Sequence, residues 1–553
     1  MLQRPSVRIQ LWAILLLAFV AYLPVLKAGF VYDDHFFIAG NSHLQTLRNI
    51  PDFFLRPQHT LADDIVWDDI FRPLRTTSFA LDYFVWKLNP LGYHLSSLGL
   101  HLLTVLLVFL FLSKFLESEA ALWGTALFAL HPVNVEAVAW ISSRADVLCA
   151  PLYLGAFLCY VRSRRTEAGG QGLRLFSWSL FLLAALAKEV ALTLPLVLLV
   201  WEALFGSKRA EQSSGAFSRY RFLIPFFATA VIYAAIWMGV LGRTSQRTWH
   251  GGTPWTNLAT AYYAWARAFS LLLMPLGLAP DHPVPPITGI EPRLWVGLGF
   301  AGFLLFCVAD RLRRGDRIAV FLIAFSFLVY LPTSSLVPLN ALVAERFLYL
   351  PLIGLAGLLG RYLWDKGKQG PQYVGVLLVC VLGALTLAQA AVWRNDAQLW
   401  DSALQAEPQS FAAHFNTGIR LKGAGAYSAA LAHLRKAVAL EPDNAHAHYY
   451  LGSDYMQEGN LGAAERHYER ALQLVPDYAN VLFDFGVLRW KQGDLVEARK
   501  IFEELHQAYP ENQTVTCYLQ HTGNPPQPGT GLSNPLQHSG LREVRPPIAV
   551  HHR

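Results

Sequence analysis

The strongest constraint on this chain is a series of long apolar segments that fill its first 393 residues. Of its 553 residues, 54% are hydrophobic and only 15% are charged, whereas a soluble globular domain averages roughly 25% charged residues. A membrane-spanning helix needs ~20 mostly apolar residues, so these segments predict a helical membrane domain. We expect an all-α protein, with about 11 transmembrane helices followed by a helical repeat array.

The predicted spans start with Ile9–Leu26, which follows Arg4 and Arg8. No A-x-A-like cleavage site follows it, so we expect an uncleaved span with a cytoplasmic N-terminus. We expect Thr256–Leu278, which carries Arg267 and many aromatic residues, to be interfacial or re-entrant. The other predicted spans are His94–Leu116, Ala120–Val138, Ala145–Val161, Leu173–Ala187, Val190–Phe205, Arg221–Leu241, Leu294–Val308, Ile318–Leu331, Phe347–Leu363 and Tyr373–Val392.

Short basic clusters separate these segments and predict their orientation. They fall after the fourth, sixth, eighth and tenth spans, and cytoplasmic loops carry an excess of Lys and Arg. This places the C-terminal array on the periplasmic or lumenal side of a bacterial inner membrane or an ER membrane. The formal charge of +6 therefore argues for membrane loops and against nucleic-acid binding. The clusters are Arg162/Arg164/Arg165, Lys208/Arg209/Arg219, Arg311/Arg313/Arg314/Arg317 and Arg361/Lys366/Lys368.

A second pattern, with a period of 34 residues, follows the apolar segments. Pro408, Pro442, Pro476 and Pro510 are each 34 positions apart, which is the length of a tetratricopeptide (TPR) repeat. The matching small and bulky residues recur with the same period: Gly418, Gly452 and Gly486, then Ala430, Ala464 and Ala498, then Leu434, Tyr468 and Phe502. Such arrays stack into solenoids with a concave groove for partner proteins.

These patterns predict three domains. A membrane domain covers residues 1–393 and contains a long first outer loop, 27–93. A TPR domain covers 394–512, with a half repeat at 395–408 and repeats at 411–444, 445–478 and 479–512. The Pro- and Gly-rich tail, 513–553, is expected to be disordered.

Charged side chains gather at the predicted outer ends of the membrane helices. Such residues are costly next to lipid unless they are paired or functional. Each one alone can be a solvated loop end or a helix anchor, but together they favour a site for a charged lipid head group. They are Asp33, Asp34, Arg72, Arg75, His131, Glu136, Arg144, Asp146, Lys188, Glu189, Glu345 and Arg346.

This residue set fits sugar transfer from a polyprenyl-phosphate donor. A carboxylate can take the proton that the acceptor hydroxyl loses as it attacks the anomeric carbon. Arg or Lys can hold the lipid phosphate and offset its growing negative charge. Asp33, Asp34 and Asp146 could ligate a hard cation, but their spacing does not demand it, so we expect no metal.

Five strings of the sequence give a more specific indication. They are GFVYDDHFFI, FRPLRTTSFALDYFVWKLNPLGYHLSSLGLHLL, HPVNVEAVAWISSRADVL, AKEVALTLPLVLL and AERFLYLP. With the order of membrane half and TPR repeats, they resemble the TMTC family, the transmembrane and TPR-containing proteins of GT-C fold that are similar to protein O-mannosyltransferases. The resemblance covers nearly the whole chain.

The resemblance implies an inverting glycosyltransferase. Its donor would be a polyprenyl- or dolichyl-phosphate sugar, with mannose expected, and its acceptor a Ser or Thr hydroxyl of an extracytoplasmic protein brought by the TPR groove. Asp33 and Asp34 match the acidic motif of the first outer loop and would be catalytic. Arg144 and Arg346 would meet the phosphate, with Arg72, Arg75 and Lys188 in reserve and His131, Glu136, Asp146, Glu189 and Glu345 in support.

Two alternatives stay open at this point. The chain could be a non-catalytic membrane scaffold that recruits proteins through its repeats. It could also carry out the same chemistry on a glycan or lipid acceptor.

Overall fold

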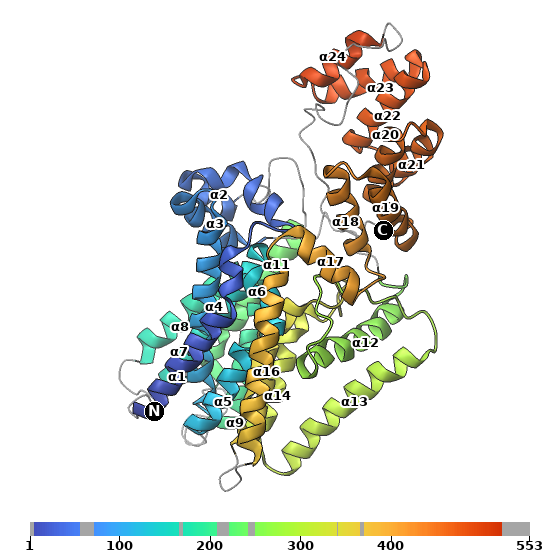
Figure 1. The fold of residues 1–553 in the computed structure, drawn as a ribbon. Helices are drawn as coiled ribbons and strands as arrows, with labels where there is room; N and C mark the ends of the chain where they lie inside the picture. The colour runs from blue at the N-terminus through green and yellow to red at the C-terminus, as the bar shows by residue number, and fades with distance from the viewer. Residues whose placement is uncertain are drawn as a thin grey trace. The chain divides into compact units, whose positions relative to one another are not determined.

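The computed structural model describes residues 5–55, 71–164, 170–206, 220–241, 249–339, 341–364 and 370–522. The regular secondary structure of these residues is helical, with no strand among them, which confirms the predicted fold class. The chain divides into two compact units, Met1–Leu399 and Trp400–Arg553, which we call the membrane unit and the repeat unit. Figure 1 shows the elements of both.

The membrane unit is a bundle of apolar helices joined by short 3-10 turns. Six helical segments within the described ranges are long and apolar enough to cross a bilayer: Pro5–Lys27, Pro90–Leu112, Ile141–Ser163, Gly170–Ala187, Pro292–Arg313 and Gly370–Val392. The α-helices are α1 (Pro5–Ala21), α2 (Ile50–Leu55), α3 (Pro73–Trp86), α4 (Pro90–Leu112), α5 (Ser118–Ala129), α6 (Val135–Ala139), α7 (Arg144–Ser163), α8 (Gly170–Ala187), α9 (Leu194–Phe205), α11 (Ile224–Leu241), α12 (Pro254–Leu273), α13 (Pro292–Arg313), α14 (Arg317–Tyr330), α15 (Pro351–Leu363) and α16 (Gly370–Val392). Helix α17 (Asp396–Ala406) begins in the membrane unit and ends in the repeat unit.

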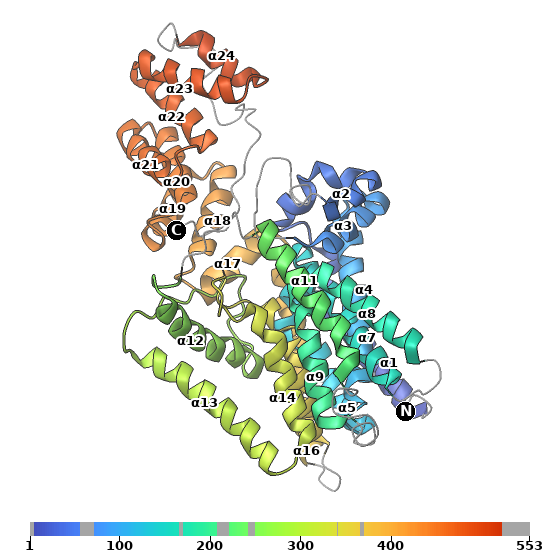
Figure 2. The same ribbon diagram turned by 180° about the vertical axis from the view of Figure 1, so that it is seen from behind.

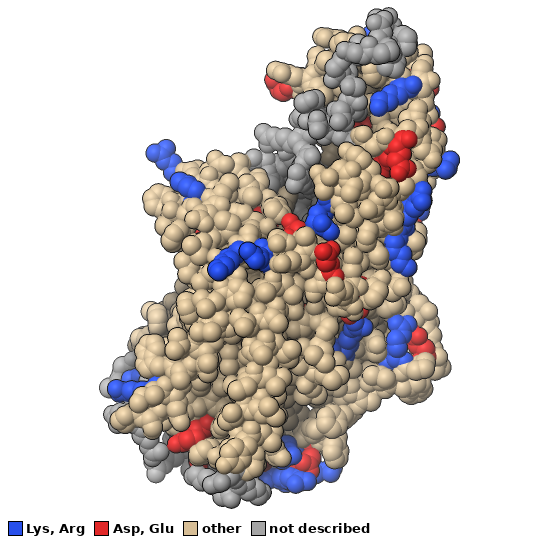
Figure 3. Space-filling view, viewed as in Figure 1, with Lys and Arg blue, Asp and Glu red and all other residues tan. Residues whose placement is uncertain are grey.

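Apart from Ala120–Val138, each predicted span lies mostly on helical residues, and local sequence sets several helix ends. The Asn89 side chain accepts a hydrogen bond from the Leu91 amide and Pro90 occupies the first turn, so α4 begins there. Seen from behind, α7, α8, α9, α11 and α14 lie side by side (Figure 2). Between its charged ends, the flank over α1 and α16 carries little charge (Figure 3), as a surface in contact with lipid requires.

One predicted span, Ala120–Val138, is not a continuous helix. Helix α5 ends at Ala129, and His131 has an extended backbone with ψ 125°. Pro132 explains this break, because a residue that precedes proline disfavours the helical conformation. The chain then continues through the 3-10 turn η6 (Pro132–Asn134) into the short helix α6. The break carries Glu136 into the polar cluster described below.

Helix α12 covers most of the segment that we expect to be interfacial or re-entrant. It has 20 residues, but it lacks the apolarity of the six spanning segments. It packs closely on α13, because a Cβ atom added to Gly297 would lie 2.6 Å from the Tyr263 amide nitrogen. Whether this segment crosses the membrane stays a prediction.

The repeat unit is an array of antiparallel helix pairs. Its helices are α18 (Phe411–Gly423), α19 (Tyr427–Leu440), α20 (Ala445–Gln457), α21 (Leu461–Leu474), α22 (Ala479–Gln492), α23 (Leu495–Ala508) and α24 (Gln513–His521). Within each pair the turn contains a glycine with positive φ, namely Gly425, Gly459 and Gly493, at 78°, 79° and 87°. These positions are also 34 residues apart, and only glycine adopts this conformation at little cost.

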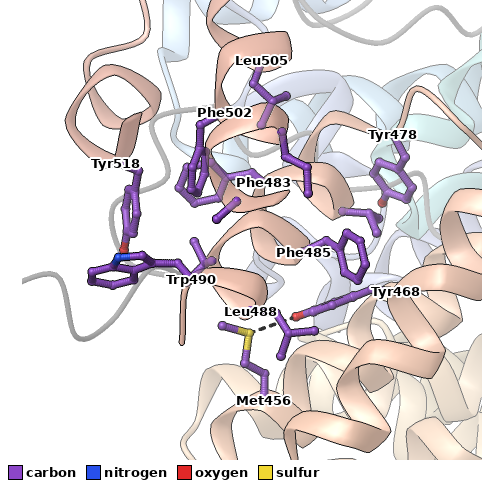
Figure 4. Packing of buried hydrophobic residues seen from close by; sticks show 14 of the residues in the cluster. Met456, Tyr468, Tyr478, Phe483, Phe485, Leu488, Trp490, Phe502, Leu505 and Tyr518 are labelled. Atoms are coloured by element: carbon purple, nitrogen blue, oxygen red, sulfur yellow. Dashed lines mark hydrogen bonds between the residues drawn. The ribbon is translucent and has the colours of Figure 1, made fainter. Parts of the chain in front are cut away.

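The helices of each pair approach closely where the sequence predicts small residues. A Cβ atom added to Gly452 would lie 2.9 Å from the Tyr468 ring, and Gly418 and Gly486 face Leu434 and Phe502 in the same way. The buried aromatic core of the later repeats, which includes Phe483 and Tyr468, is shown in Figure 4.

The last helix, α24, lies beyond the predicted end of the repeats at residue 512. Its Val515 and Tyr518 are buried, and the Tyr518 ring contacts Phe483, Trp490 and Phe502. The helix covers an apolar face that the final repeat would otherwise expose, as capping helices of solenoids do. The rest of the predicted disordered tail, residues 523–553, lies outside the described residues.

Candidate active site

The two aspartates that follow the first span have different surroundings. Asp34 is fully buried, and its carboxylate accepts hydrogen bonds from the Val31 amide at 3.2 Å, the Ser142 amide at 2.7 Å and the Ser142 hydroxyl at 2.6 Å. Asp33 is half-buried, and within the described residues no hydrogen bond reaches its carboxylate. Asp33 is thus the member of the pair that is open to a ligand.

Burial also changes the acidity of both aspartates. It raises the pKa of Asp33 to about 7; the neighbouring Asp34 raises it as well, while Arg346 and Arg75 lower it. Burial raises the pKa of Asp34 to about 6, against the hydrogen bonds from Ser142 and Val31. A carboxylate with a pKa near neutral is suited to accept a proton and to release it again.

The loop that carries the pair is strained and tied to the end of the membrane unit. Tyr32 has φ 56°, a left-handed conformation that is uncommon for a residue with a side chain. Its amide donates to the Asp396 carboxylate at 2.8 Å, and His35 Nε2 lies 2.9 Å from the other oxygen of Asp396. The Gly29 amide donates to the Arg394 carbonyl at 3.0 Å. These bonds hold the strained turn in place.

Four of the five predicted phosphate-binding cations already have carboxylate partners. Arg72 donates two hydrogen bonds to Glu189, at 2.7 and 3.2 Å, and Lys188 Nζ lies 2.6 Å from Asp146 Oδ1. Although burial opposes ionisation, Arg72 and Lys188 hold the pKa of Glu189 at about 2. The bidentate pair of Arg72 and Glu189 is therefore fully charged at neutral pH.

The two arginines that the sequence favours for the phosphate are also paired. Arg144 is 1% exposed; it contacts Asp82 and also donates to the Tyr93 carbonyl at 2.7 Å. Arg346 pairs with Glu136 through its guanidinium group, and its amide donates to the same carboxylate at 2.8 Å. The Arg346 side chain retains 20% exposure, so it is the more accessible of the two.

Arg75 is the exception among these cations. Its Nη1 donates to the Ser142 carbonyl at 3.5 Å and its guanidinium carbon lies 4.7 Å from the Phe37 ring centroid. Within the described residues it forms no ion pair, and its buried Nε has no hydrogen-bond partner. Burial and the nearby Arg72 lower its pKa to about 9, which still leaves it charged at neutral pH.

The remaining predicted residues, His131 and Glu345, support the backbone around the cluster. His131 Nδ1 accepts from the Val133 amide at 3.2 Å, and its Nε2 donates to the Leu272 carbonyl at 3.1 Å. Glu345 accepts from the Ala279 amide at 2.6 Å and lies 3.4 Å from His282. Neither side chain is placed to meet a ligand directly.

Three residues of the cluster were not predicted from the sequence: Asp82, Ser142 and Asp396. Asp82 lies on α3, where an isolated acid is typical of a solvated helix face, although it falls within one of the five family-like strings. Ser142 gives no signal of its own. Asp396 begins α17, and an acid at a helix start is ordinarily explained by the helix dipole.

The helices and the clustered charges define a class of protein. The chain is a multi-pass helical membrane protein with a buried acidic and basic cluster and a C-terminal TPR array. Comparison with known families supports the array, because a tetratricopeptide repeat family matches residues 443–511 and a TPR repeat family matches residues 424–453.

Comparison with known proteins confirms the resemblance to the TMTC family. The protein O-mannosyl-transferase Tmtc1 of Drosophila melanogaster is 26% identical over 523 residues, covering 76% of this chain. TMTC4 of Mus musculus and TMTC1 of Homo sapiens, which carry the same title, are 28% and 27% identical and cover 78% and 75% of this chain. The chain spans 60%, 67% and 53% of the length of these three relatives.

Proposed function

We propose that this protein is a membrane glycosyltransferase of GT-C type that transfers mannose from a polyprenyl-phosphate donor to Ser or Thr hydroxyls of extracytoplasmic proteins. One observation carries the proposal most: Asp33 and Arg75 are a carboxylate and a guanidinium group whose charges influence each other, and neither has an ion-pair partner among the described residues. The relatives named protein O-mannosyl-transferases support the sugar and the acceptor class.

Asp33 is the general base of this mechanism. Its carboxylate takes the proton of the acceptor hydroxyl while the hydroxyl oxygen attacks the anomeric carbon of mannose. The bond from that carbon to the phosphate oxygen breaks on the opposite face, so the lipid phosphate leaves with the electron pair and the configuration inverts. A pKa of about 7 suits this role, because a base works best when its pKa lies near the operating pH.

Asp34 positions the loop rather than the acceptor. Its carboxylate is buried and its two oxygens accept three hydrogen bonds, two of them from Ser142. It therefore fastens the turn that presents Asp33 to the start of α7. Its negative charge also helps to keep the pKa of Asp33 high.

Arg75 binds the donor phosphate. A guanidinium group offers phosphate a bidentate contact, and among the described residues Arg75 has no carboxylate partner to give up first. Arg346 is the second contact, because it is partly exposed and lowers the pKa of Asp33. Arg144, Arg72 and Lys188 hold the cluster together through their ion pairs.

The acceptor chain reaches the enzyme through the repeat unit, as the concave surfaces of other TPR arrays bind protein segments. The position of Asp33 and the identity of the acceptor are separate parts of the proposal, and they are tested separately.

The decisive experiment measures mannose transfer by the purified full-length protein from polyprenyl-phosphate mannose to Ser/Thr peptides. Asp33→Asn is expected to lower kcat by about 10²–10⁴, the usual contribution of a general base. Asp310→Asn, in the exposed ion pair with Arg314, is the matched control and should keep full activity.

Each outcome separates the proposed function from its alternatives. Full activity of Asp33→Asn would remove Asp33 from the role of base. If the wild-type protein transfers no mannose but binds partner proteins through its repeats, it would be a scaffold instead. Sugar found on a glycan or a lipid, with none on Ser or Thr, would keep the chemistry and change the acceptor.

A further inference from the structure

A cluster of three arginines lies at the end of the membrane unit opposite the candidate active site. Arg164 follows the end of α7, Arg174 lies on α8, and Arg221 begins the 3-10 turn η9 (Arg221–Leu223) that leads into α11. Helix α7 has 20 residues between Arg144 and Ser163, which corresponds to about 30 Å at 1.5 Å per residue. The cluster is thus separated from the active site by about the thickness of a bilayer core.

The three guanidinium groups surround a single aromatic ring. Their central carbons lie 5.0, 4.6 and 4.7 Å from the Phe222 ring centroid, for Arg164, Arg174 and Arg221 respectively. One carboxylate within the described residues offsets this charge: Glu202, whose Oε1 lies 2.7 Å from Arg164 Nε. Within the described residues, no ion pair involves Arg174 or Arg221. Among the described residues, the cluster therefore has an excess of about two positive charges.

An apolar groove begins next to this cluster. It has a volume of about 580 Å³ and lies between α9 and α11, where its lining includes Leu199, Tyr220, Ile224, Phe227, Ala228 and Ile232. Tyr220 directly precedes Arg221, so one end of the groove adjoins the arginines. From Tyr220 to Ile232 the chain rises by about 18 Å at helical geometry, close to the depth of one leaflet of a ~30 Å hydrocarbon core.

We propose that the arginine cluster and the groove form a binding site for an anionic phospholipid. The lipid phosphate lies among the Arg164, Arg174 and Arg221 guanidinium groups, and an acyl chain fills the groove along α11. Charge complementarity selects the occupant, because a zwitterionic head group brings no net charge to offset the two arginines that have no ion pair within the described residues. This site is independent of the proposed glycosyl transfer and of its donor lipid.

Native mass spectrometry of the detergent-solubilised full-length protein tests this site. Wild type should retain added phosphatidylglycerol in preference to phosphatidylcholine. The double variant Arg174→Gln/Arg221→Gln should bind phosphatidylglycerol roughly 30-fold more weakly, from about 1 kcal/mol for each charge near an anionic lipid. The control Arg311→Gln/Arg313→Gln removes two charges from the end of α13 and should bind normally.

A second pair of variants tests the groove itself. Ala228→Phe fills the groove and should weaken phosphatidylglycerol binding, whereas Ala235→Phe, at an exposed position on the same helix outside its lining, should not. Excess inorganic phosphate should fail to displace the lipid, because phosphate lacks the acyl chain.

Several outcomes would overturn the proposal. They are equal retention of the two lipids by wild type, unchanged binding by the arginine double variant, and displacement by inorganic phosphate alone. If the double variant does not fold, Arg221→Lys keeps the positive charge and should retain the preference, and loss of that preference would contradict the proposal.

Discussion

The membrane unit and the repeat unit organise their key contacts over very different sequence distances. In the membrane unit, the pair Lys188–Asp146 joins residues 42 positions apart and Arg346–Glu136 joins residues 210 apart. In the repeat unit, one contact recurs every 34 residues, as Gly452 meets Tyr468 within its own helix pair. The repeat unit spreads its stability over equivalent local contacts, whereas the membrane unit gathers several buried ion pairs in one cluster. Single substitutions should therefore cost far more in the cluster.

The largest effect is expected at the buried pair of Arg144 and Asp82. Asp82→Asn leaves a buried guanidinium group without its counter-charge, which costs about 3–5 kcal/mol in the free energy of unfolding. Asp310→Asn breaks an exposed pair and should cost at most about 1 kcal/mol. Thermal or chemical unfolding of both variants in detergent measures this difference, and equal losses would contradict the comparison.

The activity of the membrane unit should also depend on pH. The base must be deprotonated, so the rate rises as pH increases through about 7, the pKa of Asp33. Below that value the rate should fall about tenfold per pH unit, and above it the rate should level off. The donor phosphodiester does not titrate in this range. A flat pH–rate profile between pH 5 and pH 8 would exclude Asp33 as the titrating base.

A substitution in one repeat tests the local contacts of the repeat unit. Gly452→Val drives new atoms into the Tyr468 ring, and overpacking of this kind costs about 1–3 kcal/mol. Gly462→Val, where no atom lies within 4 Å of an added Cβ, is the matched control. Unfolding of the full-length variants should show a clear loss for the first and little change for the second.

The smallest effect is expected from a histidine pair in the repeat unit. His448 Nδ1 and His467 Nδ1 lie 2.9 Å apart, and burial, His448 and nearby arginines lower the pKa of His467 to about 4. A histidine whose pKa is lowered in the folded state contributes stability at pH values above its pKa in the unfolded chain, about 6.5. That stability is lost as the pH falls towards 4. His467→Gln should weaken this pH dependence of the melting temperature, whereas His521→Gln in α24 should leave it unchanged.

The same contrast explains what the sequence could predict. The repeats follow from local periodicity, because Gly418, Gly452 and Gly486 lie at a fixed spacing and meet partners in their own repeat. The apolar segments also predicted helices correctly, apart from the break that Pro132 introduces into one of them, and six helical segments within the described residues are long and apolar enough to cross a bilayer. The extra helix α24 was missed because its buried Val515 and Tyr518 stand alone in a polar segment.

The sequence could predict which charged residues form the candidate site, but not which of them pair with each other. Asp33, Asp34 and Arg75 stand out as charges next to apolar segments, but the sequence does not show that Arg144 is neutralised by Asp82. That pairing depends on how α3 packs near the start of α7. Among the described residues Asp33 and Arg75 have no ion-pair partner, a fact on which the proposed mechanism depends and which only the three-dimensional arrangement reveals.

The bonds between the Asp33 loop and Asp396 have a consequence for biosynthesis. The Tyr32 amide and its acceptor Asp396 are 364 residues apart, so at 5–20 residues per second the ribosome makes the acceptor roughly 20–70 s after the loop. The strained turn cannot take its final shape on the nascent chain until the last membrane helix has emerged. A chain that stops short of residue 396 would carry both aspartates but lack the hydrogen bonds to Asp396 that hold their loop in place. Catalytic competence would therefore be acquired only at the end of membrane insertion.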